Sequence, residues 1–321
     1  DAADIDISTI TDPNGLEIVR QDSYDYPLGR NWAQASGQSA LSITLPYNNQ
    51  YQLVAGEWYF NVRHYDSIDN LPKDLKVYYY IKSEEEMVTS EPLEMSLNFF
   101  VVDMPDYQGE HDPNLLEFIS TLSDGLTQFG ITLADYNIFE IGSEAETLTI
   151  IDSETDLNSN NNADDMDALF QLSEFVENSY LNIFLVRGFT GESLLGMAGG
   201  ISGPTMIQGT KNSGVAINSF GSIENLYSYR NLQSETVIHE IGHFIGLFHT
   251  TESGGTRFDS MSDTPECPQA IFDTNNDHIL SSSECRYVDG PNLMFWSAAS
   301  FSQNHLSEGQ LNIFKRSPVL K

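Results

Sequence analysis

One stretch decides the fold of this chain: His239-Glu240-Ile241-Gly242-His243-Phe244-Ile245-Gly246-Leu247-Phe248-His249. In a helix, His239 and His243 lie one turn apart on nearly the same face, so both imidazoles can converge on one metal ion. Gly246 can adopt the left-handed conformation that ends helices, which lets the chain turn and return His249 to the same ion. Three neutral histidines with an open fourth position are typical of a catalytic zinc site. Glu240 would point aside, toward a water on the metal.

The alternative interpretation is an apolar helix that happens to carry scattered histidines. Three of the seven histidines of the chain, however, fall at fixed offsets in this one segment. Glutamate and glycine also occupy the two positions where a hydrolytic mechanism needs them. We therefore predict one catalytic zinc ion.

These residues carry a family resemblance. The motif His239-Glu240-x-x-His243-x-x-Gly246-x-x-His249, followed by Asn292-Leu293-Met294-Phe295-Trp296, resembles the metzincin metallopeptidases with their Met-turn. Asp263-Thr264-Pro265 is similar to the pappalysin (ulilysin-like) family within that clan. The resemblance implies an α+β catalytic domain with a mixed sheet, an active-site helix and Met294 beneath the zinc. Many relatives have tyrosine where this chain has Trp296, and an indole cannot act as a phenolate ligand.

The amino-acid composition limits the classes of binding partner. The 321 residues include 47 acidic and 14 basic side chains, for a formal net charge of −33. Such a surface repels nucleic acid and anionic lipid, so we expect neither as a partner. No apolar run approaches the roughly 20 residues that cross a bilayer. Asp1-Ala2-Ala3-Asp4 does not resemble a signal peptide, so the protein is either intracellular or its signal peptide has been removed. The acidic composition and the single pair of cysteines favour removal and export.

We expect two domains. Residues 1–92 predict an all-β sandwich that serves as an accessory or pro-domain, with strands at 15–20, 40–45, 51–54, 58–62 and 75–81. A cysteine-switch propeptide is excluded because this part contains no cysteine. After the charged connector at 83–86, residues 93–321 predict the catalytic domain. Its strands are expected at 96–103, 137–141, 147–151 and 181–187, and its helices from Asp112-Pro113, near 165–176 and from Ser307.

A glycine-rich segment at 194–201 is the predicted edge strand of the active-site cleft. A peptide substrate could add to Gly196, Met197, Ala198 and Gly199 as a further extended strand. Glycine permits close approach of a second backbone. A flexible glycine loop explains the segment equally well.

Residues 273–284 have the spacing of an EF-hand calcium loop. The ligands would be Asp273, Asn275, Asp277, the carbonyl of Ile279 and a bidentate Glu284. His278 stands at the sixth position, where glycine with positive φ is usual. An ordinary acidic loop is the alternative, and the Asp- and Asn-rich stretch 152–165 is a weaker calcium candidate.

Cys267 and Cys285 bracket that loop, and in an exported enzyme they predict a disulfide that closes it. Two free thiols in a cytoplasmic protein are the alternative.

The leading hypothesis is a secreted, zinc-dependent endopeptidase that acts on protein or peptide substrates and is supported by calcium. Two others remain: a non-catalytic binding or adhesion protein stabilised by calcium and zinc, and a zinc hydrolase of non-peptide amides. The presence of Glu240 beside all three ligands favours an enzyme. Oligomeric state is left without a prediction.

Overall fold

The structure is a computed structural model, and it describes residues 4–20, 33–36, 41–45, 52–65, 78–79, 82, 93–152, 165–190 and 194–321. Most of the strand predicted at 75–81, the connector at 83–86 and the acidic residues 153–164 lie outside the described part of the chain.

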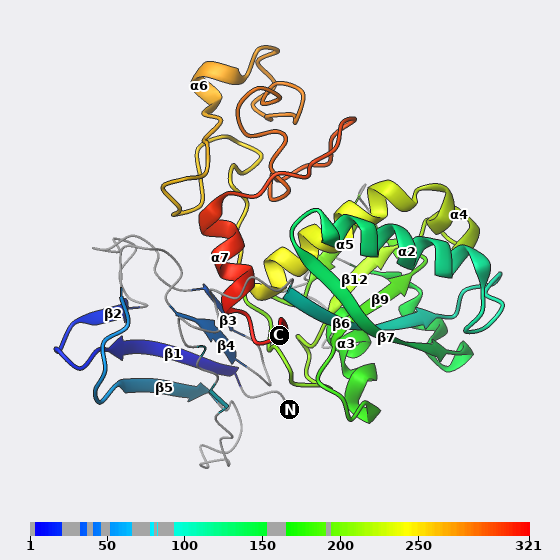
Figure 1. The fold of residues 1–321 in the computed structure, drawn as a ribbon, viewed down its shortest axis with the longest axis horizontal. Coiled ribbons are helices and arrows are strands. Elements are labelled where there is room, and N and C mark those ends of the chain that lie inside the picture. The colour runs from blue at the N-terminus through cyan, green and yellow to red at the C-terminus, as the bar shows by residue number, and fades with distance from the viewer. Residues whose placement is uncertain are drawn as a thin grey trace.

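A five-stranded mixed sheet forms the centre of the region after residue 92 (Figure 1). Its order is β11 (Gly196–Ala198), β12 (Val215–Asn218), β9 (Leu181–Val186), β6 (Leu93–Val102) and β7 (Ile131–Ile141). Neighbouring strands from β12 to β7 are parallel, and β11 runs antiparallel to β12 at the edge. The predicted α+β fold class is confirmed.

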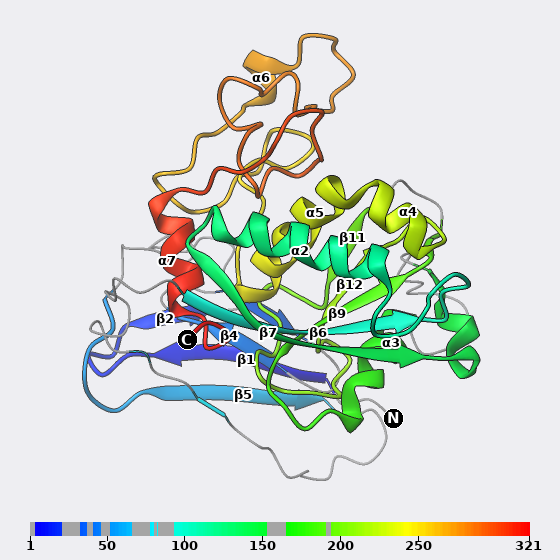
Figure 2. The same ribbon diagram turned by 45° about the vertical axis from the view of Figure 1, so that its right-hand side comes forward.

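Strand β6 shows why this sheet is covered on both faces. Leu97, Phe99 and Val101 pack into one core, with helices α2 (Pro113–Thr127) and α5 (Arg230–Ile245). Phe100 and Val102 point to the opposite face and a second core, which includes α3 (Asp165–Gln171). A near-continuous apolar strand is expected where both faces are buried. Figure 2 shows α2 and α5 together above the sheet and α3 on the other side.

Helix α2 begins where its sequence predicts. The side chain of Asp112 accepts from the backbone N–H groups of Asn114 and Leu115, at 2.9 and 3.2 Å, and Pro113 follows at the first helical position. Gly130, with φ +74°, turns the chain into β7. The remaining elements of this region are short: η1 (Ser143–Leu148), β8 (Ile150–Ile151), η2 (Leu172–Phe175), β10 (Gly188–Phe189), α4 (Ile223–Ser228), α6 (Gln269–Phe272) and α7 (Glu308–Arg316).

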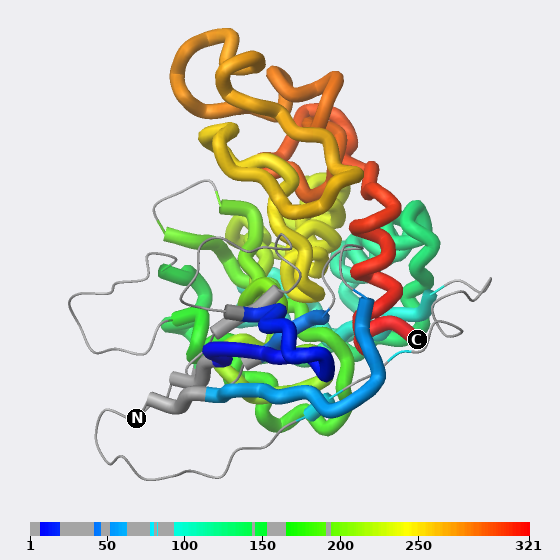
Figure 3. The backbone as a smooth tube through the Cα atoms, turned by 90° about the vertical axis from the view of Figure 1, so that its left-hand side faces the viewer, coloured from blue at the N-terminus to red at the C-terminus, as the bar shows by residue number. Residues whose placement is uncertain are grey.

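The segment between α5 and α7 extends away from the sheet, as the yellow-to-orange part of Figures 1 and 3 shows. It contains the one-turn helix α6, and the rest is turns and irregular backbone with isolated β-bridges. Helix α7 then returns the chain toward the sheet and begins with a capping box between Ser307 and Gln310.

The N-terminal part contains a three-stranded antiparallel sheet in the order β2 (Glu17–Arg20), β1 (Asp4–Thr11), β5 (Tyr59–Tyr65), and a pair formed by β3 (Ala33–Ser36) and β4 (Leu41–Thr44). Ile43 and Leu45 pack against the small core of this sheet. The predicted strand at 51–54 is wrong for the described residues 52–54, which belong to no strand. The β-sandwich itself stays a prediction.

Candidate metal centre

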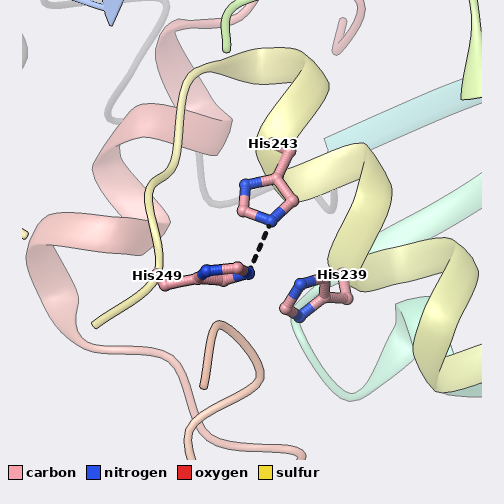
Figure 4. A group of neighbouring side chains, drawn as sticks. All are labelled: His239, His243 and His249. Carbon is pink, nitrogen blue, oxygen red and sulfur yellow. Dashed lines mark hydrogen bonds between the residues drawn. The ribbon is translucent and has the colours of Figure 1, made fainter. Parts of the chain in front are cut away.

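The three histidines of the motif converge on one point (Figure 4). His239 and His243 project from α5, and His249 reaches them from the segment beyond its end. The Nε2 atoms of His243 and His249 lie 3.0 Å apart. In the described part of the chain, no other group of three or more His, Cys, Asp or Glu side chains brings candidate ligand atoms within 4.8 Å of one another.

Each imidazole is held by its Nδ1 atom. His239 Nδ1 lies 2.6 Å from the carbonyl oxygen of Leu293, and His243 Nδ1 lies 2.8 Å from that of Leu247. His249 Nδ1 lies 3.1 Å from a carboxylate oxygen of Glu252. Because these partners are acceptors, each Nδ1 must carry the proton, which leaves the Nε2 lone pairs free for a metal.

Burial favours the neutral imidazoles that a metal requires. Desolvation, followed by the nearby His249, lowers the pKa of His239 to about 3. Desolvation also lowers the pKa of His243 well below its ordinary value, with the two neighbouring imidazoles adding to the effect. Nitrogen ligands of a tetrahedral zinc ion, each about 2 Å from it, lie roughly 3.3 Å from one another. The donor set therefore fits zinc.

Glu240 is buried beside this centre and faces the edge strand. Burial raises the pKa of its carboxyl to about 8, opposed by a hydrogen bond from the backbone of Ala198 in β11. A Cβ added to Gly196 would lie 2.9 Å from Glu240 Cγ. The glycine predicted for close approach of a substrate thus also admits Glu240.

Gly246 ends α5 with a φ of +120°, as the motif predicts. Its N–H and that of Leu247 bond back to carbonyls of the last turn, and the chain then turns toward His249. Beyond the ligand, the N–H of Thr250 donates to the carbonyl oxygen of Met294 at 3.0 Å. The third histidine and the Met-turn are therefore joined through the backbone.

The predicted edge strand is present but shorter than its glycine-rich segment. β11 covers Gly196, Met197 and Ala198, and among the described residues it pairs only with β12, at the end of the sheet. Gly199 continues the pairing, with its N–H 2.9 Å from the carbonyl oxygen of Gly214.

The loop 273–284 adopts part of the conformation that its spacing predicts. His278, at the sixth position, has a φ of +65°. Asp273 Oδ1 is buried without a hydrogen-bond partner. Glu284, however, accepts from Thr274 and Ser281, and Asp277 from Asn275 and the N–H of Ile279. The carboxylates of the loop are not gathered into a metal-ligating group.

Cys267 and Cys285 form the predicted disulfide. The bridge packs with Leu280 and Phe295 in a small core of its own, flanked by Trp296. The indole N–H of Trp296 donates to the carbonyl oxygen of Leu280 at 2.6 Å. Trp296 thus ties the segment after Met294 to the loop.

Two residues of the site were not predicted. Glu252 holds His249, and buried Asp289 accepts from the hydroxyls of Thr250 and Thr251 at 2.8 and 2.6 Å. Glu252 and Asp289 both lie in irregular segments, where no periodic sequence pattern marks them. The only sequence cue was the position of Glu252, three residues after the third histidine.

The match to a protein family agrees with the motif. Residues 164–312 match the peptidase family M43, described as pregnancy-associated plasma protein-A. No curated protein matches the chain. Solved structures similar to it include a promirolysin mutant from Tannerella forsythia (18% identity, TM-score 0.42, covering 73% of this chain and 83% of that one). Others are metalloproteinase-II from Bacteroides fragilis (16%, 0.35, 69% and 52%) and archaemetzincin from Methanopyrus kandleri (13%, 0.32, 52% and 81%).

Proposed function

We propose that this chain is a secreted endopeptidase in which Glu240 is the general base. The chain is a pappalysin-like metzincin and a zinc metalloprotease. The observation that carries the proposal is the arrangement of His239, His243 and His249. Their Nδ1 atoms are bonded to acceptors and their other nitrogens face one another, with a buried carboxyl alongside. A structural zinc site is closed by its protein ligands and does not require the carboxyl of Glu240.

Zinc bound by the three imidazoles would supply a Lewis acid and a water of lowered pKa. Glu240 would accept a proton from the attacking water and deliver it to the leaving amine. Burial raises the pKa of the Glu240 carboxyl above its ordinary value, which favours its holding that proton between the two steps. The hydrogen bond from Ala198 would hold the carboxylate in place between these two steps.

The substrate would bind as an extended strand along β11. Among the described residues this strand pairs on one side only, which leaves its outer backbone groups available for pairing, apart from the Ala198 N–H that bonds to Glu240. Gly196, Met197, Ala198 and Gly199 would line the bound substrate, and the hydrogen bonds would come from those backbone groups that do not already bond to β12, Gly214 or Glu240. Such recognition requires an extended peptide, which favours protein or peptide substrates over small amides.

Loop 273–284 would bind one structural calcium ion through Asp273, Asn275, Asp277, Ile279 and Glu284. The positive φ of His278 and the unpartnered, buried Oδ1 of Asp273 support this site. Calcium would have to replace the hydrogen bonds that Glu284 now accepts from Thr274 and Ser281. Binding would therefore rearrange the loop.

The proposed location is extracellular. The Cys267–Cys285 disulfide is typical of oxidising compartments, and the charge of −33 gives a heavily solvated surface that keeps an exported protein soluble. Among the helices of the described residues, none has the length and apolar character needed to cross a membrane.

The deciding experiment is proteomic cleavage-site profiling of the wild type beside Glu240→Ala. We expect internal cleavage sites in peptides exposed to the wild type, all of them absent with the variant. Equal profiles from both proteins would reject Glu240 as the base. Absence of any cleavage by zinc-loaded wild type would favour a binding protein or a hydrolase of other amides.

A further inference from the structure

The three imidazoles are not held alike. His239 and His243 lie on α5, and each is bonded to a neutral backbone carbonyl. His249 lies outside the helix and is bonded to the carboxylate of Glu252. The ligand with the least support from secondary structure therefore has the only charged partner of the three. Charge-assisted hydrogen bonds are roughly twice as strong as neutral ones.

Glu252 belongs to a tight turn. Its N–H donates to the carbonyl oxygen of Arg257 at 3.0 Å, and its own carbonyl oxygen accepts from Gly255 at 2.8 Å. The side chain is 46% exposed, so packing alone does not hold the carboxylate toward His249. Its direction depends on the backbone of the turn.

That turn is attached to the disulfide-closed loop through Leu280. The N–H of Leu280 donates to the carbonyl oxygen of Ser253 at 2.8 Å, next to Glu252, and its carbonyl oxygen accepts from Trp296. A second bond, of 3.0 Å, joins the N–H of Gln269 to Gly255. Leu280 thereby links the turn that follows the third histidine to the segment that follows Met294.

We propose that Glu252 is the positioning residue for His249, and that Leu280 keeps the turn bearing Glu252 in place. This inference rests on the proposed zinc site at the three histidines. Glu252 fixes the ring orientation and the protonated nitrogen of His249, and its negative charge strengthens the imidazole as a donor to zinc. The loop 273–284 thus contributes to zinc binding although none of its residues touches the metal centre.

The first test compares Glu252→Gln with Glu266→Gln, a matched change at an exposed glutamate of the same segment. Zinc affinity is measured by competition with a chromophoric chelator, and the cobalt-substituted proteins are compared by their visible absorption spectra. We expect Glu252→Gln to weaken zinc binding about 10- to 100-fold and to shift the cobalt bands. Glu266→Gln should match the wild type.

The second test uses two adjacent glycines. Gly255 has a φ of +56°, and a Cβ there would overlap the side chain of Leu280, whereas a Cβ at Gly254 would meet nothing closer than 3.9 Å. Gly255→Ala should weaken zinc binding and Gly254→Ala should not. In the Glu252→Gln background, Gly255→Ala should add less than about twofold, because both changes act through one contact. If circular dichroism shows Gly255→Ala to be unfolded, Trp296→Phe, which removes the side-chain donor to Leu280, takes its place in the same cycle.

The outcomes separate the two proposals. Folded wild type that binds no zinc at all would overturn the metal site itself. Tight zinc binding by the wild type with the same affinity and cobalt spectrum in Glu252→Gln would overturn the role of Glu252 alone. Additive losses from Glu252→Gln and the turn variant would remove Leu280 from the proposal.

Discussion

The sulfur of Met294 packs directly against Gly242, on the helix turn between the first two histidines. A Cβ added to Gly242 would lie 2.5 Å from Met294 Sδ and 3.2 Å from its Cε, and Met294 is fully buried. The absence of a side chain at residue 242 is therefore what lets the Met-turn approach the helix. Since Leu293 next to Met294 accepts the bond from His239, this approach also places the first imidazole.

Gly242→Ala should displace Met294 and loosen the zinc site. Overpacking of this kind costs about 1–3 kcal/mol of folding free energy. We expect a lower melting temperature together with weaker zinc binding, measured by thermal denaturation and chelator competition. Gly188→Ala is the control, because its Cβ would meet no atom closer than 3.7 Å. Equal effects of the two substitutions would show that Gly242 has no special relation to Met294.

Glu240→Gln should keep zinc and lose turnover. The substitution removes the proposed base and leaves all three histidines in place, so metal content should stay at about one zinc per chain. General acid–base catalysis accounts for about 10²- to 10⁴-fold in rate, and we expect a loss of kcat in that range with peptide substrates.

The control for this variant is Glu117→Gln, at an exposed position of α2, which should retain wild-type kcat. Retention of activity by Glu240→Gln at full zinc content would assign the base to another residue. A parallel loss of zinc and activity would instead make Glu240 a structural residue.

Asp259 should make the fold less stable as pH rises. Burial raises the pKa of its carboxyl from 3.8 to about 7, although Thr264 and the N–H of Met261 donate to it and oppose the shift. The pKa in the folded state thus exceeds that of the unfolded chain, so the folded state binds more protons between these two values. Stability should therefore fall from about pH 4 to about pH 7 and change little above that window.

Asp259→Asn keeps the shape of the side chain and an acceptor oxygen but cannot ionise. Its stability relative to the wild type should increase with pH across the same window. Urea denaturation of both proteins at several pH values, at one fixed zinc concentration, measures this difference. Parallel stability curves would mean that Asp259 does not titrate between the folded and unfolded states in this range.

The parts of the fold that were predicted depend on short-range patterns. The histidine offsets, the stop at Gly246 and the cap at Asp112 each involve neighbours within a few residues, and all three appear in the structure. Strand β7 begins at Ile131, six residues before its predicted start, because it lies at the sheet edge and its first half is largely exposed. An exposed edge strand lacks the continuous apolar run that marks a buried one.

The partners of the imidazoles could not be predicted for a different reason. Leu293 contacts His239 through its carbonyl oxygen across 54 residues of sequence. Every residue type has the same backbone carbonyl group. The residue type at position 293 therefore gives no sign of the contact. Strand β1 was also missed, because Asp4 and Asp6 interrupt its apolar residues and resemble a polar terminus.

Calcium should stabilise the protein through loop 273–284. The carboxylates of Asp273, Asp277 and Glu284 repel one another in a chain of net charge −33, and a bound cation would remove that repulsion. Leu280 lies within the loop and bonds to Ser253, so ordering the loop should also stabilise the segment beyond His249. We expect the melting temperature to rise with calcium concentration, as mass action requires for a ligand of the folded state.

The comparison is between the wild type and the double variant Asp273→Ala/Asp277→Ala, titrated with calcium at one fixed zinc concentration. Chelators are avoided because EGTA also removes zinc from the histidines. The variant should melt at a temperature independent of calcium, while Glu266→Ala, which changes an exposed carboxylate outside the loop, should respond as the wild type does. If the double variant responds to calcium like the wild type, the cation binds elsewhere, and residues 152–165, with their many Asp and Asn side chains, are then the next to be substituted.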